Sequence, residues 1–215
     1  MSNFAGIQSV GPMSRDSTFS VASSPSRLVA ALEIHMRLIT VAALSLLATP
    51  LLAQQAPPPG FRDRQIADFE RERRMTLAMV DSMPEGLLHF KPVKEVRDFA
   101  QQIAHAATPV AIFASRTKGG PVPVLGDSTV YLNAKPALRA LVVKAYDYAL
   151  GVLRETPEAD YTVPVAFAGQ QMPRWRVFAL AHEHSVWTRG ELVSYFRLNG
   201  MAPPAFDLFG GGGGE

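Results

Sequence analysis

The sequence predicts an all-α fold, a four-helix bundle, from three observations. Four stretches of the chain repeat apolar residues at the spacing of an amphipathic helix. Connectors containing Gly and Pro separate these stretches. The stretches are of similar length, and helices of this kind bury their apolar faces most simply against one another. We therefore expect one helical core.

The first two helices are expected over residues 61–83 and 93–117. Apolar and charged side chains alternate with helical periodicity in both stretches. Pro84 ends the first, since proline cannot continue a helix without losing a hydrogen bond. Residues 119–131 follow as a long irregular connector, which is able to cross over the bundle.

The last two helices are expected over residues 134–155 and 173–199. Asn133 is a candidate N-terminal cap of the first of these. The second ends at Asn199-Gly200, a pair suited to a left-handed helix cap. Residues 156–172 between them are expected to be irregular, with residues 161–167 able to extend.

A secretory signal peptide is expected over residues 36–53. The basic Arg37 precedes an apolar run that ends on the small residue Ala53, which is the order typical of a signal peptide. The run is shorter than the roughly 20 residues of a membrane-spanning helix, so we expect no stable membrane span after cleavage. The protein is therefore expected to be exported, periplasmic or secreted; the alternative is an uncleaved anchor.

The expected signal peptide separates an upstream segment from the folded part of the chain. Upstream of it lies a Ser-rich segment, either a disordered extension or sequence before a true start at Met36. We expect four segments besides the signal peptide. They are the extension over residues 1–35, a Pro-rich linker over 54–60, the bundle over 61–206 and a Gly-rich flexible tail over 207–215.

Composition and missing motifs exclude several functions. The 21 Lys and Arg residues nearly balance the 19 Asp and Glu residues, which gives no reason to expect a nucleic-acid partner. The chain has no cysteine, which excludes disulfides, thiolate nucleophiles and Cys-bound metals. It also lacks a Gly-rich phosphate loop and a nucleophile elbow. Residues 71–74 are expected as a charged, solvated helix face.

Two polar stripes point to a site inside the bundle. A helix advances by about 100° per residue, so each set shares a face of its helix. The stripes are Asp98, Gln101, Gln102 and His105 on the second helix, and His184, Thr188, Glu191 and Tyr195 on the fourth. Facing stripes would enclose a polar pocket, and bundle interiors hold metals in this way. The alternative is that each histidine is only a hydrogen-bonded core residue. His182, about 200° around the helix from His184, should point elsewhere.

The same residues resemble the DinB-like (YfiT-type) four-helix-bundle family. The likeness rests on His105, His184, Arg189-Gly190 and the run LNGMAPP over residues 198–204. It implies an up-down-down-up bundle and one divalent metal, zinc or nickel, bound by one histidine of the second helix and two of the fourth. Thiol-dependent transferases and isomerases belong to this family, and many of its members have no assigned activity.

The resemblance implies His105, His184 and Glu191 as metal ligands. Thr188 stands where the third histidine is expected, and Glu191 where glutamine is usual, so Glu191 is the candidate to complete the set. Its alternative role is an ion pair with Arg189 or Arg197. Because of Thr188, it stays open that no metal is bound.

Two functions follow. The first is an exported, divalent-metal-dependent transferase or hydrolase with a degenerate site, whose catalytic residues are unassigned. The second is a non-catalytic, metal-free module that binds a small molecule or a protein. The partner is an unknown small molecule, and a homodimer is left open.

Three other residues of the last helix carry expectations. Gly190 weakens a helix by about 1 kcal/mol relative to Ala, so its presence predicts a close approach of a neighbouring element. Trp187 and Tyr195 are expected to pack in the core.

Overall fold

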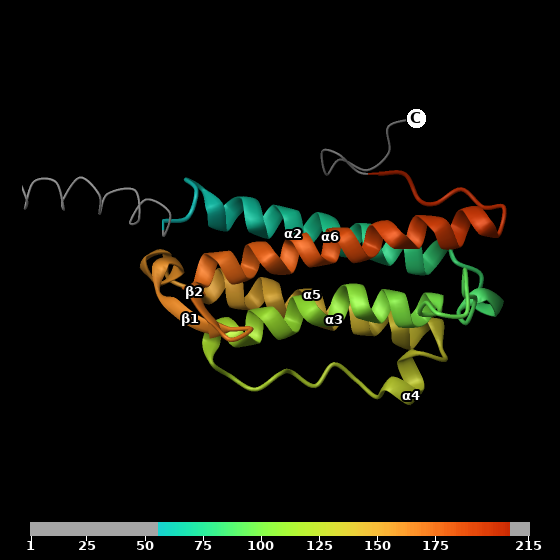
Figure 1. The fold of residues 1–215 in the computed structure, drawn as a ribbon, viewed down its shortest axis with the longest axis horizontal. Helices are drawn as coiled ribbons and strands as arrows, with labels where there is room; N and C mark the ends of the chain where they lie inside the picture. Colours follow the sequence, from blue (N-terminus) through green and yellow to red (C-terminus); the bar gives the residue numbers. More distant parts are fainter. Residues whose placement is uncertain (1–55, 207–215) are drawn as a thin grey trace, which may run out of the picture. The chain divides into compact units, whose positions relative to one another are not determined.

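A computed structural model describes residues 56–206. Within this range four long helices form the fold: α2 (Phe61–Ser82), α3 (Phe99–Lys118), α5 (Lys135–Glu155) and α6 (Arg174–Leu198) (Figure 1). The predicted all-α class is confirmed. The expectations for the signal peptide, for the segment before it and for the C-terminal tail lie outside the described residues.

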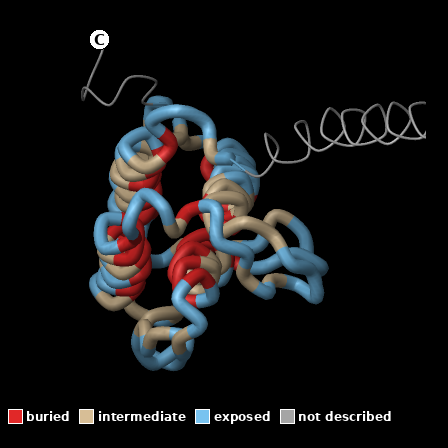
Figure 2. The backbone as a smooth tube through the Cα atoms, turned by 90° about the vertical axis from the view of Figure 1, so that its left-hand side faces the viewer, coloured by how far each residue is buried: buried red, intermediate tan, exposed pale blue. Residues whose placement is uncertain are grey.

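The four helices enclose one core. α3 packs against α5 and α6, and α2 packs against the same two helices, so α2 and α3 lie across a diagonal. Figure 2 shows that the buried side of each helix faces the others. Large side chains without solvent exposure fill the centre, among them Phe69, Phe99, Tyr146, Phe178 and Phe196. Burial of apolar surface of this kind is the main stabilising contribution to folding.

The connection between α3 and α5 runs back along the bundle before α5 begins (Figure 1). It ends in the short helix α4 (Ser128–Tyr131), which periodicity did not predict. Asp127 caps α4, since its Oδ1 accepts a hydrogen bond of 2.8 Å from the backbone N–H of Thr129. The crossover therefore has a fixed structure where the sequence indicated only a loop.

The connection before α6 contains a small hairpin, whose first strand lies in the segment expected to extend and whose second strand was not predicted. After the 3-10 turn η2 (Glu158–Thr162), strand β1 (Pro164–Phe167) pairs antiparallel with β2 (Gln170–Pro173). Ala168 and Gly169 link the strands with φ values of 49° and 79°. Positive φ at both central residues is typical of the turn that joins two twisted strands most tightly. An earlier 3-10 turn, η1 (Glu85–Leu87), follows α2.

The predicted start of α3 and the predicted cap of α5 were wrong. α3 begins at Phe99 rather than near residue 93, because Asp98 and Gln101 form a capping box: Asp98 Oδ1 accepts from the Gln101 N–H at 2.8 Å, and Gln101 Oε1 accepts from the Asp98 N–H at 3.1 Å. Asp98 therefore caps the helix. At α5, Ala134 rather than Asn133 occupies the cap position.

The predicted end of α6 is confirmed. Gly200 has φ 69°, its N–H donates to the Arg197 carbonyl at 3.1 Å, and the Met201 N–H donates to the Phe196 carbonyl at 3.0 Å. These two bonds define a Schellman cap, which stops a helix where glycine takes the left-handed conformation. None of the helices described has both the length and the apolar character needed to cross a membrane.

Of the three expectations for individual residues of α6, one is confirmed and two were wrong. Tyr195 is only 3% exposed, as predicted for core packing. Trp187 is 77% exposed, so its predicted burial was wrong. A Cβ added at Gly190 would meet nothing within 4 Å, so the expected close approach was also wrong.

We expect Gly190→Ala to raise the free energy of unfolding by about 1 kcal/mol, because alanine loses less backbone entropy in a helix and has room here. Gly200→Ala should lower it by about 1 kcal/mol, since alanine is strained at positive φ. Urea unfolding of both variants measures the difference. Destabilisation by Gly190→Ala would contradict the open environment seen at that position.

Candidate functional site

Three hydrogen bonds set the register between α3 and α6. The Tyr195 hydroxyl donates to the Arg97 carbonyl at 2.7 Å, just before α3 begins. Gln102 Nε2 donates to the Thr188 carbonyl at 3.1 Å, and Arg174 Nε donates to the Thr117 carbonyl at 2.9 Å. Along this seam residue numbers rise on α3 as they fall on α6, so the two helices are antiparallel. Two of these bonds lie near the start of α3 and one near its end, which leaves the two helices little freedom to slide.

This register places His105 of α3 opposite His184 of α6. Their ring centroids lie 5.1 Å apart with an interplanar angle of 75°. Both rings are partly buried. Phe113, two turns further along α3, lies 5.9 Å from the His184 ring, centroid to centroid. The structure thus brings together the two histidines that the sequence analysis selected.

Both histidines are held in the neutral form. Burial is the main cause that lowers the pKa of His105 and of His184 below the ordinary value of 6.5, and the positive charge of Arg97 acts in the same direction. The negative charge of Glu191 opposes this shift at both rings. A neutral imidazole is the form that binds a metal or accepts a proton.

The chemistry of the pair suits a divalent metal. Imidazole nitrogen is a common ligand of zinc and nickel. The Nδ1 atom of His184 is buried and has no hydrogen-bond partner among residues 56–206. A buried polar atom without a partner is costly, and binding at one of the ring nitrogens is one way to satisfy such a group. The two histidines therefore fit a shared metal as two of its ligands.

Glu191, the third predicted ligand, is placed apart from this pair. Its Oε2 accepts a hydrogen bond of 2.6 Å from Gln102 Nε2, one turn before His105 on α3. It also stands seven positions after His184, which is about two helical turns, or roughly 10 Å. No group of three His, Cys, Asp or Glu side chains able to hold a metal occurs in the described range. The role of Glu191 as a ligand stays a prediction.

On α6, Thr188 stands at the position where a third histidine ligand was expected. It lies one turn after His184 and is 3% exposed. The proposed ion pair of Glu191 with Arg189 or Arg197 is not among the salt bridges of residues 56–206, and the Gln102 amide takes that place. On the Glu191 side of the histidine pair, Gln102 joins α3 to α6 by two hydrogen bonds. One goes to the Thr188 carbonyl and the other to the Glu191 carboxylate.

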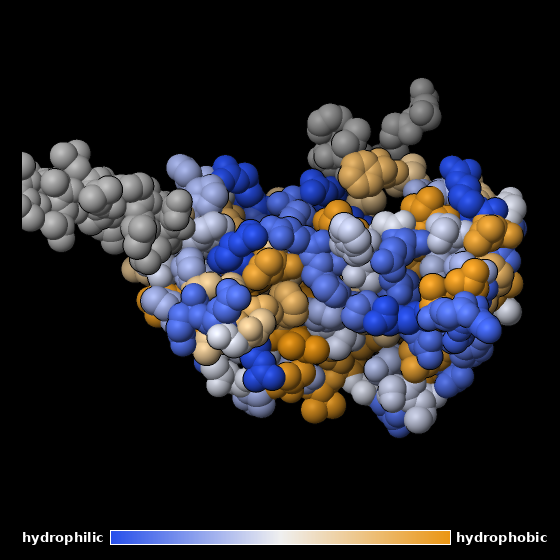
Figure 3. Space-filling model, viewed as in Figure 1, coloured by the Kyte–Doolittle hydropathy of each residue, from blue (hydrophilic) through white to orange (hydrophobic). Residues whose placement is uncertain are grey.

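Two hollows adjoin the histidine pair, one at each ring. His105 lines a hollow of about 600 Å³ together with Arg97, Gln101, Thr108 and residues of the crossover. His184 lines a second, of about 370 Å³, with Phe113, Phe167, Leu180, Glu183 and Trp187. The first carries polar groups and a positive charge, and the second is largely apolar. Figure 3 shows apolar side chains gathered near the hairpin end of this face.

A second polar cluster, which the sequence analysis missed, lies between α2, α5 and α6. Glu72 is completely buried and forms an ion pair with Nδ1 of His182, so the expectation that residues 71–74 form a solvated face was wrong at this residue. Tyr146 and Ser185 share a hydrogen bond of 2.6 Å beside it, and Arg189 is buried. His182 does point away from His184, as helical geometry predicts. The signal available in the sequence was the helical spacing of Glu72 with the buried Phe69, Met75 and Thr76.

The chain is thus a four-helix-bundle protein with one histidine on each of two neighbouring antiparallel helices. Residues 68–186, more than half of the chain, match the DinB superfamily, and the chain belongs to that family. No curated protein matches it.

Two solved structures share the fold. A DinB-like protein of Bacillus subtilis, YjoA, aligns with a TM-score of 0.55 at 19% identity, over 67% of this chain and 97% of that one. A DinB-like protein of Bacillus cereus aligns with a TM-score of 0.53 at 19% identity, over 63% and 91% of the two chains. The predicted family resemblance is confirmed.

In the metal-free protein, His105 and His184 should titrate below pH 6.5 in an NMR experiment, because burial and Arg97 lower both pKa values. The unfolded chain then takes up protons first as the pH falls. The stability that these groups contribute is full above pH 6.5 and is lost between pH 6.5 and their folded pKa values. Arg97→Gln should move both titrations upward. Titration of either ring above 6.5 would contradict this electrostatic picture.

His182 should behave in the opposite way, because its hydrogen bond with Glu72 raises its pKa. Its contribution to stability is full below pH 6.5 and is lost as the pH rises through the folded pKa. Glu72→Gln should remove both effects, as seen by NMR titration and by urea unfolding at pH values on either side of 6.5. An unchanged His182 titration in Glu72→Gln would show that the pair is not what raises its pKa.

Proposed function

We propose that this chain is an exported metal-dependent transferase or hydrolase, with one zinc or nickel ion bound between His105 and His184. The main support is the pair of neutral, partly buried imidazoles on neighbouring helices, with ring centroids 5.1 Å apart. The proposal includes the up-down-down-up helix order implied by the family, which agrees with the course of the chain in Figure 1. Export rests on the signal-like residues 36–53.

Each residue of the site has a role in this proposal. His105 and His184 would hold the ion, and Glu191 or water would complete its ligands. Gln102 keeps one oxygen of Glu191 engaged at 2.6 Å, so the carboxylate would reach the ion only if that bond opened. When bound, the metal would polarise a substrate oxygen or lower the pKa of a water molecule. The walls of both hollows would bind and orient the substrate beside it.

The second candidate function is a metal-free binding module on the same bundle. Thr188 in place of a third histidine favours it, because two protein ligands hold zinc less firmly than three. The apolar hollow beside His184 also favours it, because such a cavity binds small molecules without any metal.

Metal content after reconstitution distinguishes the two functions. If the first is correct, the purified protein should retain about one equivalent of zinc or nickel after gel filtration. His184→Ala should abolish this binding, because it removes one of two imidazole ligands. His89→Ala is the matched control, since His89 is exposed on the connector before α3. Less than about a tenth of an equivalent in the unmodified protein would exclude the metal-dependent function.

Thr188→His should strengthen metal binding by at least roughly tenfold, since it adds a third imidazole one turn from His184. Competition with a chromophoric chelator measures the change. A double variant, Thr188→His with His184→Ala, should lose the gain. If Thr188→His binds zinc no better than the unmodified protein while remaining folded by circular dichroism, the proposed position of the ion is wrong.

A further inference from the structure

We propose that the site binds a small amphiphile, with an apolar ring-sized group in the hollow beside His184 and an anionic group near Arg97. This inference names the ligand class of the proposed site and rests on the proposed function only for the position of the reacting centre. The atoms that link the two groups would pass over the histidine pair.

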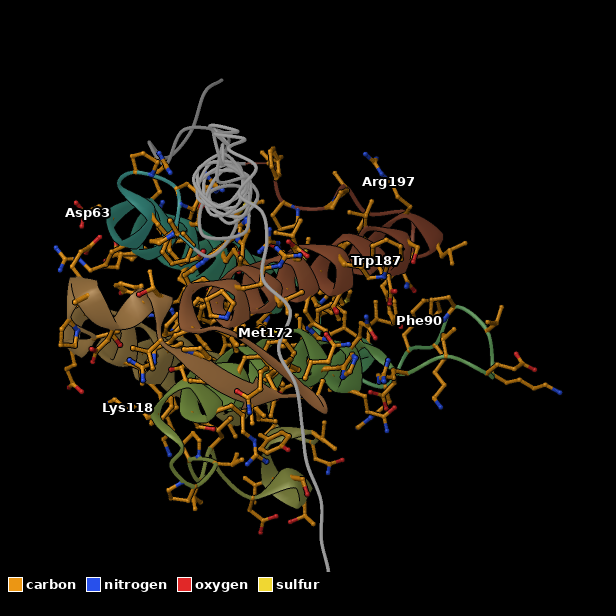
Figure 4. The ribbon with its side chains drawn as sticks, turned by 60° about the vertical axis from the view of Figure 1, so that its left-hand side comes forward. Asp63, Phe90, Lys118, Met172, Trp187 and Arg197 are labelled. Carbon is orange, nitrogen blue, oxygen red and sulfur yellow. The ribbon has the colours of Figure 1, made fainter. Side chains whose placement is uncertain are left out.

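The apolar half is built from aromatic side chains of three elements. Phe113 of α3 and Phe167 of β1 contact edge to face, with ring centroids 4.6 Å apart. Trp187 of α6, labelled in Figure 4, lines the same hollow although 77% of it is exposed. Leu180 completes the apolar wall. A hollow of about 370 Å³ with such walls is of the size and character that bind aromatic or short aliphatic groups.

The charges around this hollow do not favour a cation. Glu183 lies at its edge, but its carboxylate already pairs with Arg176 at 2.8 Å. Glu191, which accepts a hydrogen bond of 2.6 Å from Gln102, is not among the residues that line this hollow. The apolar hollow therefore selects ligand groups by burial of their apolar surface. Selection by ligand charge occurs in the neighbouring hollow.

The polar half carries a positive charge without a matching carboxylate. Arg97 lines the hollow of about 600 Å³ with Gln101, Thr108 and His105. Its side chain is exposed, and it forms no salt bridge within residues 56–206. Arginine is well suited to bind carboxylate, sulfonate or phosphate through paired N–H donors. Gln101 and Thr108 add polar side chains to the same wall.

The histidine pair connects the two halves into one site. His105 belongs to the polar hollow and His184 to the apolar one, and their rings are in contact. The proposed ligand, with both groups on a short chain, would occupy both hollows at once. Linked groups bind more tightly than separate ones, because the second contact is made at a high effective concentration.

The experiment uses the metal-free full chain with four probes: 4-phenylbutyrate, 4-phenyl-1-butanol, 4-phenylbutylamine and butyrate. Isothermal titration calorimetry in the presence of a chelator measures each dissociation constant. We expect phenylbutyrate to bind best, the neutral alcohol next, and the amine and butyrate least. Equal binding of the amine and the acid, or tighter binding of butyrate than of the alcohol, would overturn the proposed ligand class.

Two variants assign the halves to their residues. Trp187→Ala should weaken phenylbutyrate and phenylbutanol alike, by roughly three- to tenfold, because both use the aromatic hollow. Leu198→Ala, at another exposed apolar residue of α6, should leave both unchanged. Arg97→Gln should weaken phenylbutyrate alone by roughly two- to fivefold, the range for an exposed charge pair. Arg197→Gln is its control.

The outcomes separate this inference from the proposed function. Amphiphile binding without zinc or nickel retention supports the inference and removes the metal-dependent function. Metal retention with no preference among the four probes removes the inference and leaves the metal centre standing. If Trp187→Ala and Arg97→Gln both bind phenylbutyrate as well as the unmodified protein, the ligand does not occupy these two hollows and the inference is wrong.

Discussion

The bundle depends on partners for the polar side chains that α6 places in the interior. His182 of α6 pairs with Glu72 of α2, and Ser185 of α6 shares a hydrogen bond with Tyr146 of α5. Between α6 and α3, the Gln102 amide donates to the backbone carbonyl of Thr188 and to the Glu191 carboxylate. Buried polar groups without such partners would oppose folding by more than a typical hydrogen bond contributes. The position of α6 is therefore set by polar pairing as well as by apolar contact.

The same constraint creates the candidate site. Because hydrogen bonds hold α3 and α6 in register, His105 and His184 lie opposite each other. Burial keeps both rings neutral, while Arg97 and Glu191 act on them with opposite sign. A scaffold rigid at the seam and hollow on either side of it is suited to hold a reacting group in place.

The sequence predicted α2 and α6 within a residue of their ends, because Pro84 follows α2, Pro173 precedes α6 and Gly200 follows it. It placed the start of α3 too early, because the Asp98–Gln101 capping box competes with apolar residues before it that look helical. It also selected the two histidines that meet. It failed for Trp187 and Glu72, since helical spacing gives a face but not which neighbour covers that face.

The sequence by itself determined the all-α class, the family, the end of α6 and the pair His105 and His184. These follow from local properties: helical spacing, the left-handed preference of Gly200, and side-chain chemistry. Only the tertiary structure decided that Glu191 binds Gln102, that Glu72 is buried against His182, and that Trp187 borders a hollow. Each of these depends on the register between helices far apart in the chain, which no local pattern of residues specifies.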